Sequence, residues 1–177
     1  MCRLCYQKET GKRSRVETVW SDYLDQHLGT HFLLGSDQAA VTLGGCSRKR
    51  PDKLYGSSDL VELDECDEHQ HSYHNGSYAC EEQRLSELYD EPSISGKQLV
   101  VIRWNPHAYN VPSGKKRLTL DERLQVMVAL KQRLRVCLPT TLITVFYVCY
   151  STNNPHLVRG YPSHFIYDLA DVTHVCW

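Results

Sequence analysis

The order in which helix-like and strand-like segments follow one another is the feature that most constrains the fold of this chain. Residues 14–28 carry apolar side chains at helical spacing, and Ser14 and Glu17 have the spacing of a capping box, which predicts that a helix begins there. The apolar run 31–34 stops at a Gly-Ser-Asp sequence, which predicts a short buried strand and then a turn. A helix followed by strands therefore opens the fold.

Two further strands are predicted on either side of a short turn. Segments 51–55 and 60–67 flank the Gly-Ser-Ser-Asp sequence at 56–59, a composition typical of turns. Because so short a connection joins strands that run in opposite directions, we expect an antiparallel hairpin. Residues 78–90 then have helical periodicity and end before Pro92, and the apolar run 99–102 predicts a central strand.

The last elements follow the same alternation. Thr119 and Glu122 repeat the capping-box pattern and open a helix that we expect to run to about Cys137. Residues 141–150 are rich in β-branched and aromatic side chains and predict a strand, whereas 152–177 have no clear pattern and are expected to be irregular.

The resulting order is helix, three strands, helix, strand, helix, strand, which predicts an α/β fold with a mixed central sheet flanked by helices. The chain has 177 residues, 41% of them hydrophobic, which suffices for one core. We expect a single domain over 1–177, with its core at 14–150.

Composition narrows the cellular setting. Eight cysteines lie mostly inside apolar patterns rather than in a loop-rich frame, which favours a reducing intracellular compartment, cytoplasm or nucleus, over a disulfide scaffold. We expect no secretion signal and no association with a membrane, because no apolar run approaches the roughly 20 residues that cross a bilayer. The net charge of −1 means that any surface for nucleic acid must come from local separation of charge.

Acidic side chains gather near the end of the second hairpin strand. On a strand, alternate residues share a face, so Val61, Leu63, Glu65 and Asp67 point together, with the carboxylates at the carboxyl end. Asp52 stands on the preceding strand, where it can lie beside them. Carboxylate oxygens that converge in this way suit Mg²⁺ or Mn²⁺.

Two other interpretations of these acids remain open. The run can be a solvated acidic edge, as most charge runs are. Glu62 and Asp64 could be the functional pair instead, but they point to the opposite face of the strand, and we therefore favour Glu65 and Asp67.

The sequences Arg50-Pro51-Asp52, Glu65-Cys66-Asp67-Glu68 and Arg103-Trp104-Asn105-Pro106 together resemble the PD-(D/E)XK nuclease superfamily, in particular its very-short-patch-repair-like and EDxHD homing endonuclease branch. The likeness covers about residues 14–150. It implies a restriction-endonuclease-like core of order α-β-β-β-α-β and a metal-dependent enzyme that hydrolyses phosphodiester bonds in double-stranded DNA, as a homing or mobile-element endonuclease does.

The resemblance also implies roles for the site residues. Asp52, Glu65 and the Cys66 carbonyl would bind the metal, and Asp67 would complete its shell or orient water. Asp67 departs from the family, which has a lysine there, so that the positive charge would come from His71, Arg103 or Lys53. His71 could also move protons in the reaction, or be only a structural partner of the acidic strand.

Arg103 is a candidate catalytic residue, and Asn105, Glu17 and Glu68 are assigned more weakly. Arg103 and Asn105 end the next strand, the edge where open α/β sheets bind ligands, and Arg103 suits a phosphate or an ion pair with the acids. Glu17 would approach the metal from the first helix, although its capping box accounts for it without function. Glu68 is a further acid beside the site.

Basic and cysteine clusters complete the candidates. Phosphate contacts are expected from two basic clusters: Arg48, Lys49, Arg50 and Lys53; and Lys115, Lys116 and Arg117. A structural Zn²⁺ could be held by Cys2 and Cys5, which is half of a zinc knuckle, or by a set drawn from Cys66, His69, His71, His74 and Cys80.

A second functional class stays open. The missing lysine favours a catalytically inactive or toxin-like descendant that uses the nuclease fold to bind nucleic acid or a protein, whereas the retained Asp52, Glu65 and His71 favour the enzyme. An RNase has no separate support in the sequence. Either a monomer or a homodimer is compatible with the chain.

Overall fold

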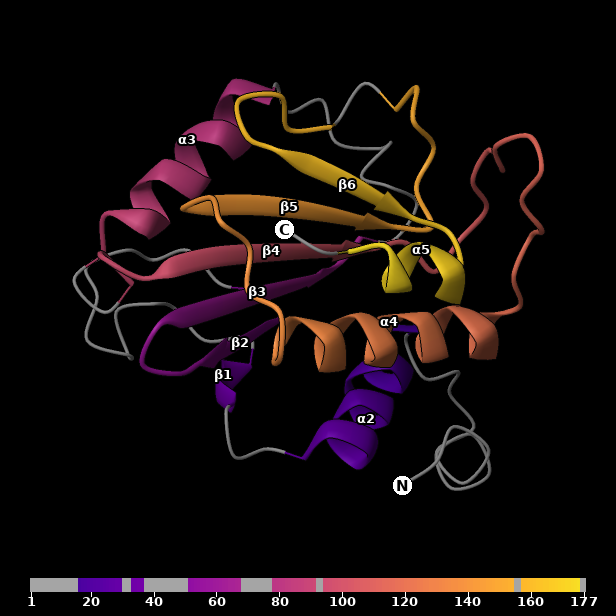
Figure 1. The fold of residues 1–177 in the computed structure, drawn as a ribbon, viewed down its shortest axis with the longest axis horizontal. Helices are drawn as coiled ribbons and strands as arrows, with labels where there is room; N and C mark the ends of the chain where they lie inside the picture. The colour runs from indigo at the N-terminus through magenta and orange to yellow at the C-terminus, as the bar shows by residue number, and fades with distance from the viewer. Residues whose placement is uncertain are drawn as a thin grey trace.

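A computed structural model describes residues 16–29, 33–36, 51–67, 78–91, 94–154 and 157–175. These residues form one sheet with helices on both of its faces, as Figure 1 shows. The helices are α2 (Val16–Leu28), α3 (Tyr78–Tyr89), α4 (Leu120–Leu134) and α5 (Leu169–Thr173). The strands are β1 (Leu33–Ser36), β2 (Lys53–Gly56), β3 (Leu60–Cys66), β4 (Gln98–Trp104), β5 (Ile143–Val148) and β6 (Ser163–Ile166).

The strands lie side by side in the order of the sequence, from β1 to β6. The first three are antiparallel to one another, and β3, β4, β5 and β6 are parallel. The short turn after β2 requires reversal of direction, whereas α3 and α4 carry the chain back across the sheet so that β4 and β5 can run parallel to β3. The sheet is therefore mixed, as the sequence predicts.

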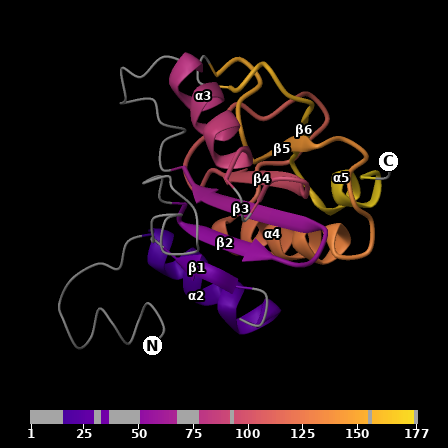
Figure 2. The same cartoon turned by 90° about the vertical axis from the view of Figure 1, so that its left-hand side faces the viewer.

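Two hydrophobic cores lie on the two faces of the sheet. On one face, Trp20 of α2 and Met127 of α4 pack against Trp104 of β4, and the Trp20 and Trp104 rings stack with their centroids 6.2 Å apart. On the other face, Leu85 and Leu88 of α3 pack against β3, β4 and β5. Figure 2 shows the resulting layers, with α3 on one side of the sheet and α2 and α4 on the other.

Most of the predicted elements are confirmed. The hairpin is antiparallel, with Lys53 opposite Asp64 and Gly56 opposite Val61. The Thr119 side chain accepts a hydrogen bond from the Glu122 amide, and the Glu122 side chain reaches back to Thr119, so the second capping box is present. These elements depend on local signals, which the sequence carries.

Several elements differ from the expectation, as at β1, at α4 and in residues 152–177. β1 continues through Gly35 and Ser36, because the strand pairs with β2 past an irregularity in the register where a turn was predicted. α4 ends at Leu134 rather than near Cys137. The segment 152–177, predicted to be irregular, contains β6 and α5, which are only four and five residues long and too short for a periodic pattern. The predicted cap Ser14 lies outside the described residues.

In the described part of the chain, no helix has the length and apolar character needed to span a membrane.

Candidate functional site

The predicted carboxylates meet at the carboxyl end of β3, on the face that α3 covers. Val61 and Leu63 belong to the core beneath α3, and two residues further along the same face Glu65 contacts Arg84 of α3. Strand alternation therefore places the apolar pair under the helix and the acids beyond it, as the sequence predicts.

Asp52 reaches the same place from the start of β2. Because Lys53 pairs with Asp64 in the hairpin, the register brings Asp52 opposite Glu65. The Cys66 amide donates a hydrogen bond to Asp52 Oδ2 at 2.7 Å, which ties this carboxylate to the end of β3. Two acids distant from each other in the sequence thus become neighbours.

Two arginines and one tyrosine hydroxyl contact the other two acids, Glu65 and Asp67. Arg84 forms an ion pair with Glu65. Arg103 Nε donates to Asp67 Oδ2 at 2.5 Å, and the Tyr150 hydroxyl donates to the same oxygen. Asp67 and Arg103 are 1% and 4% exposed, so this pair is shielded from water. Arg103 therefore places a positive charge next to Asp67.

Burial and mutual repulsion make two of these acids hard to ionise. Burial raises the pKa of Asp52 to about 6, and the negative charges of Glu17 and Asp67 add to this effect. Burial raises the pKa of Glu65 to about 7, with Arg84 opposing the shift and Asp52 and Asp67 adding to it. A site that resists losing its protons in this way is stabilised by a bound cation.

The donor set fits a hard divalent cation in part. Asp52 and Glu65 offer carboxylate oxygens side by side, and Mg²⁺ commonly takes one or two carboxylates with water and substrate phosphate. Asp67, expected to be a third ligand, is instead engaged by Arg103 and Tyr150. Within the residues that the structure describes, no group of three or more His, Cys, Asp or Glu side chains is gathered as metal ligands would be.

Asn105 and Glu17 occupy different positions relative to the site. The Asn105 side chain is fully buried and donates to the carbonyl of Cys149 at 2.8 Å, which is a structural role. Glu17, in the first turn of α2, is close enough for its charge to raise the pKa of Asp52. Its approach to a metal stays a prediction.

Lys53 was predicted to contact phosphate, and the structure contradicts this prediction. Its side chain is 1% exposed and donates to Asp25 Oδ1 of α2 at 2.6 Å. Because it is paired with Asp64 in the hairpin, it points to the face opposite Glu65. Buried there, Lys53 does not lie on a surface where a phosphate could bind.

The basic cluster at 115–117 has partners inside the protein. Lys115 pairs with Asp168 and Asp171 at 2.8 and 2.6 Å, which joins the loop before α4 to α5. Lys116 is 74% exposed and pairs with Glu122 at 2.9 Å. Arg117 donates to a backbone carbonyl at 3.3 Å. Lys116 and Arg117 are both exposed, whereas Lys115 is half-buried.

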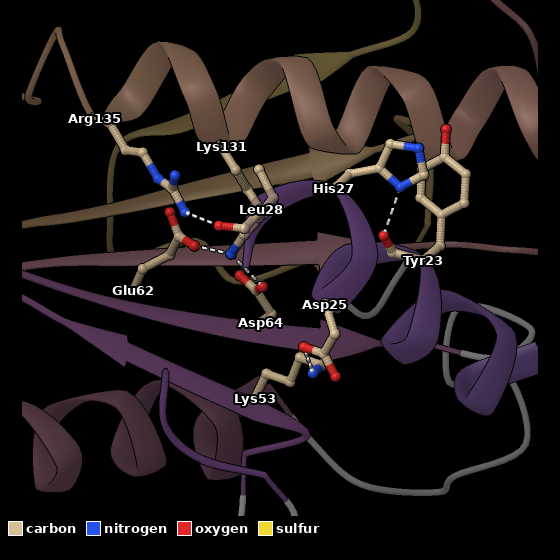
Figure 3. Close-up of polar contacts among 9 residues, drawn as sticks. All are labelled: Tyr23, Asp25, His27, Leu28, Lys53, Glu62, Asp64, Lys131 and Arg135. Carbon is tan, nitrogen blue, oxygen red and sulfur yellow. Dashed lines mark hydrogen bonds and ion pairs between the residues drawn. The ribbon is translucent and has the colours of Figure 1, made fainter. Parts of the chain in front are cut away.

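The alternative acids Glu62 and Asp64 point to the α4 face, where Figure 3 shows them around Lys131. Lys131 pairs with Glu62 and donates to Asp64 Oδ2 at 2.6 Å, and its ammonium lies 3.7 Å from the centre of the Tyr55 ring. Burial raises the pKa of Asp64 and lowers that of Lys131. These groups are buried between β3 and α4, so they hold the two layers together and are not accessible to a macromolecular substrate.

A cavity of about 270 Å³ adjoins this cluster. It is lined by Tyr55 and Glu62 together with residues 56–57 and 59–60 and the chain after α4. It lies at the amino end of β3, the opposite end from Asp52, Glu65 and Asp67, and is therefore separate from the candidate site.

The structure adds two residues to the site, Arg84 and Tyr150, to which the sequence gave no role. Arg84 follows from the apolar stripe of α3, because it lies one position before the buried Leu85 and on the side toward β3. Tyr150 has no such signal, because strand alternation after Tyr147 predicts that it faces α4. Several candidates lie outside the described residues or have undescribed side chains: Cys2, Cys5, Arg48, Lys49, Arg50, Glu68, His69, His71, His74 and Cys80.

The chain matches no family model, and comparisons with curated proteins and with solved structures find no match. Function is therefore inferred from the geometry of the site.

Proposed function

We propose that this protein is a metal-dependent endonuclease of PD-(D/E)XK type that hydrolyses phosphodiester bonds in double-stranded DNA. The observation that carries the proposal is the meeting of Asp52 and Glu65 at the carboxyl end of β3, with Asp67 and two arginines around them. The element order α2, β1, β2, β3, α3, β4 and its strand directions support the same assignment.

The chemistry follows from these groups. Asp52 and Glu65 would hold Mg²⁺ or Mn²⁺, which lowers the pKa of a coordinated water and neutralises charge that develops on a phosphate. Arg84 and Arg103 place positive charge next to the acids, where a DNA phosphate would approach. His71 remains the proposed proton carrier.

The test is cleavage of duplex DNA by the full chain. Supercoiled plasmid and labelled duplex are incubated with Mg²⁺, Mn²⁺ or EDTA. We expect Asp52→Asn and Glu65→Gln to abolish cleavage and to leave DNA binding largely intact, because each removes a metal ligand and no phosphate contact. Asp59→Asn is the matched control, since this exposed acid precedes the other end of β3.

Two results would overturn the proposal: a wild-type protein that cuts neither substrate with either metal, or cleavage that survives both Asp52→Asn and Glu65→Gln in folded protein. Parallel assays on single-stranded DNA and RNA report whether another nucleic acid is the substrate.

A second candidate is a nuclease-fold protein that binds nucleic acid or a protein without cutting. The observation in its favour is Asp67, which replaces the family's lysine and is held by Arg103 and Tyr150. This interpretation expects wild type and Asp52→Asn to bind DNA equally well, with no cleavage by either.

A further inference from the structure

The strand β5 changes the direction of its side chains at its carboxyl end. Val145 and Tyr147 pack in the core on the α3 face, and Phe146 and Val148 pack in the core on the α4 face, as an alternating strand requires. Continued alternation would turn residue 149 toward α3 and residue 150 toward α4. The structure has the reverse: Cys149 lies in the α4 core and Tyr150 in the α3 core.

The cause is the backbone of Cys149. Its φ of 59° is in the left-handed region, and it is the one non-glycine residue with positive φ in the described part of the chain. The Cys149 amide donates to the Ile166 carbonyl at 2.9 Å, and its carbonyl accepts from Asn105 Nδ2 at 2.8 Å. The neighbouring strands β4 and β6 thus hold the reversed residue in place.

The consequence is that a buried tyrosine enters the candidate site. The Tyr150 hydroxyl donates to the Asp67 oxygen that also accepts from Arg103. The Tyr150 ring is 1% exposed and packs edge-on against Tyr147, with ring centroids 5.1 Å apart. Donors from the ends of β4 and β5 therefore converge on an acid that follows β3, and they set the orientation of its carboxylate.

We propose that Tyr150 is a positioning residue of this site. Its hydroxyl, which the left-handed backbone of Cys149 turns to the α3 face, fixes the carboxylate of Asp67 beside Asp52 and Glu65. The negative charge of Asp67 then adds to the attraction of Asp52 and Glu65 for a cation. This inference rests on the proposed function, because it assigns Tyr150 to the same cation-binding and cleavage site. The role belongs to the hydroxyl, since the ring has a separate role in the core.

Tyr150→Phe in the full chain tests the role, because it removes the hydroxyl and keeps the ring. Mn²⁺ affinity is measured by calorimetry, and kcat and KM on labelled duplex DNA are measured separately. Loss of a hydrogen-bond partner that orients a metal ligand lowers metal affinity or activity by roughly 10- to 100-fold, and because Tyr150 orients Asp67, which lies beside the ligands, the lower end of this range applies. We expect weaker Mn²⁺ binding and a lower kcat of this order, with KM for DNA unchanged.

Tyr147→Phe is the matched control. Tyr147 is the neighbouring buried tyrosine, and its hydroxyl accepts a hydrogen bond from the Val158 amide rather than contacting Asp67. This variant should lose stability but keep the Mn²⁺ affinity and kcat of wild type.

A second pair of variants tests the reversed residue. Cys149→Gly accepts a positive φ without strain and should retain Mn²⁺ affinity, whereas Cys149→Val, whose branched side chain disfavours that conformation, should lose affinity as Tyr150→Phe does. Circular dichroism establishes that each variant is folded before the comparison.

The outcomes separate this inference from the proposed function. If wild type cuts DNA and folded Tyr150→Phe matches Tyr147→Phe in Mn²⁺ affinity and kcat, the positioning role is wrong and the nuclease proposal stands. If wild type binds Mn²⁺ but does not cut, and Tyr150→Phe binds it more weakly, the nuclease proposal fails and the positioning role stands. If wild type neither binds Mn²⁺ nor cuts, both are wrong.

Discussion

Glu65 is 8% exposed and lies between the guanidinium of Arg84 and the carboxyl groups of Asp52 and Asp67. Burial raises the pKa of Glu65 to about 7, because the charges of Arg84 and Arg103 do not offset the burial and the two neighbouring acids. Most buried carboxylates in stable proteins have enough partners to remain ionised. A buried carboxyl group with a raised pKa is typical of a functional site, where a bound ligand supplies the positive charge that the protein lacks.

The raised pKa gives a pH-dependent stability with a defined sign. Because folded Glu65 holds its proton to about pH 7 but the unfolded chain loses it near 4.5, the metal-free protein should become less stable as pH rises between these values. The loss is about 3 kcal/mol if the whole shift is realised. Urea unfolding at a series of pH values measures it.

Glu65→Gln should make that profile shallower by the share of Glu65 and leave the share of Asp52, whose pKa is raised to about 6. Mg²⁺ should stabilise wild type more at pH 8 than at pH 5. A metal-free stability that rises between pH 4.5 and 7, with the same slope in Glu65→Gln, would show that Glu65 does not control it.

Some side-chain positions in the site can be predicted from the sequence, and others depend on tertiary contacts. The common face of Glu65 and Asp67 follows from strand alternation, which needs no tertiary information. Lys53 was misassigned to a DNA-binding surface because its burial depends on Asp25 of α2, 28 positions away in the chain. Tyr150 was missed because the reversal at Cys149 depends on hydrogen bonds to β4 and β6.

Among the elements, α4 is attached to the sheet by charge as well as by apolar packing. Lys131 occupies a buried position in the apolar stripe of the helix and is paired with Glu62 and Asp64 of β3. The Asp64 atom Oδ1 is buried without a hydrogen-bond partner. The contact is therefore costly to disturb, because acids and amine are removed from water together.

Lys131→Met should destabilise the protein by about 3–5 kcal/mol, because it leaves Glu62 and Asp64 buried without their cation. Chemical denaturation measures the change. Adding Glu62→Gln and Asp64→Asn to Lys131→Met should recover much of the loss, since the uncompensated charges are then gone. Gln132→Met, on the exposed side of the helix, is the control. Equal stability of Lys131→Met and Gln132→Met would contradict a buried ionic contact.

The short elements at the carboxyl end are formed by tertiary contacts. The described part of β6 pairs with β5 from Val145↔Ser163 to Val148↔Ile166, and α5 is capped by Asp168, which also binds Lys115. Four or five residues are too few to nucleate a helix or to show a strand period by themselves. The hairpin and the capped helix α4, by contrast, were predictable because a turn sequence and a capping box are local.

At the scale of the whole molecule, a net charge of −1 means that DNA binding would rely on a few local cations. Lys53 is buried, and Lys115 is engaged with two acids. Arg48, Lys49 and Arg50 lie outside the described residues, but they precede Asp52 by at most four positions.

The salt dependence of DNA binding should distinguish these two basic clusters. Each phosphate contact that is lost reduces the slope of log K against log salt concentration by about 0.9. We expect replacement of Arg48, Lys49 and Arg50 by Ala to weaken DNA binding and to reduce the slope by about 0.9 or more, which corresponds to the loss of at least one phosphate contact. Replacement of Lys115, Lys116 and Arg117 by Ala should change the slope less, because their partners already lie within the protein, and should instead loosen the attachment of α5. Fluorescence anisotropy on a labelled duplex between 50 and 200 mM salt measures both slopes. A larger effect from the 115–117 cluster would show that the main phosphate contacts come from the loop before α4 rather than from the residues that precede Asp52.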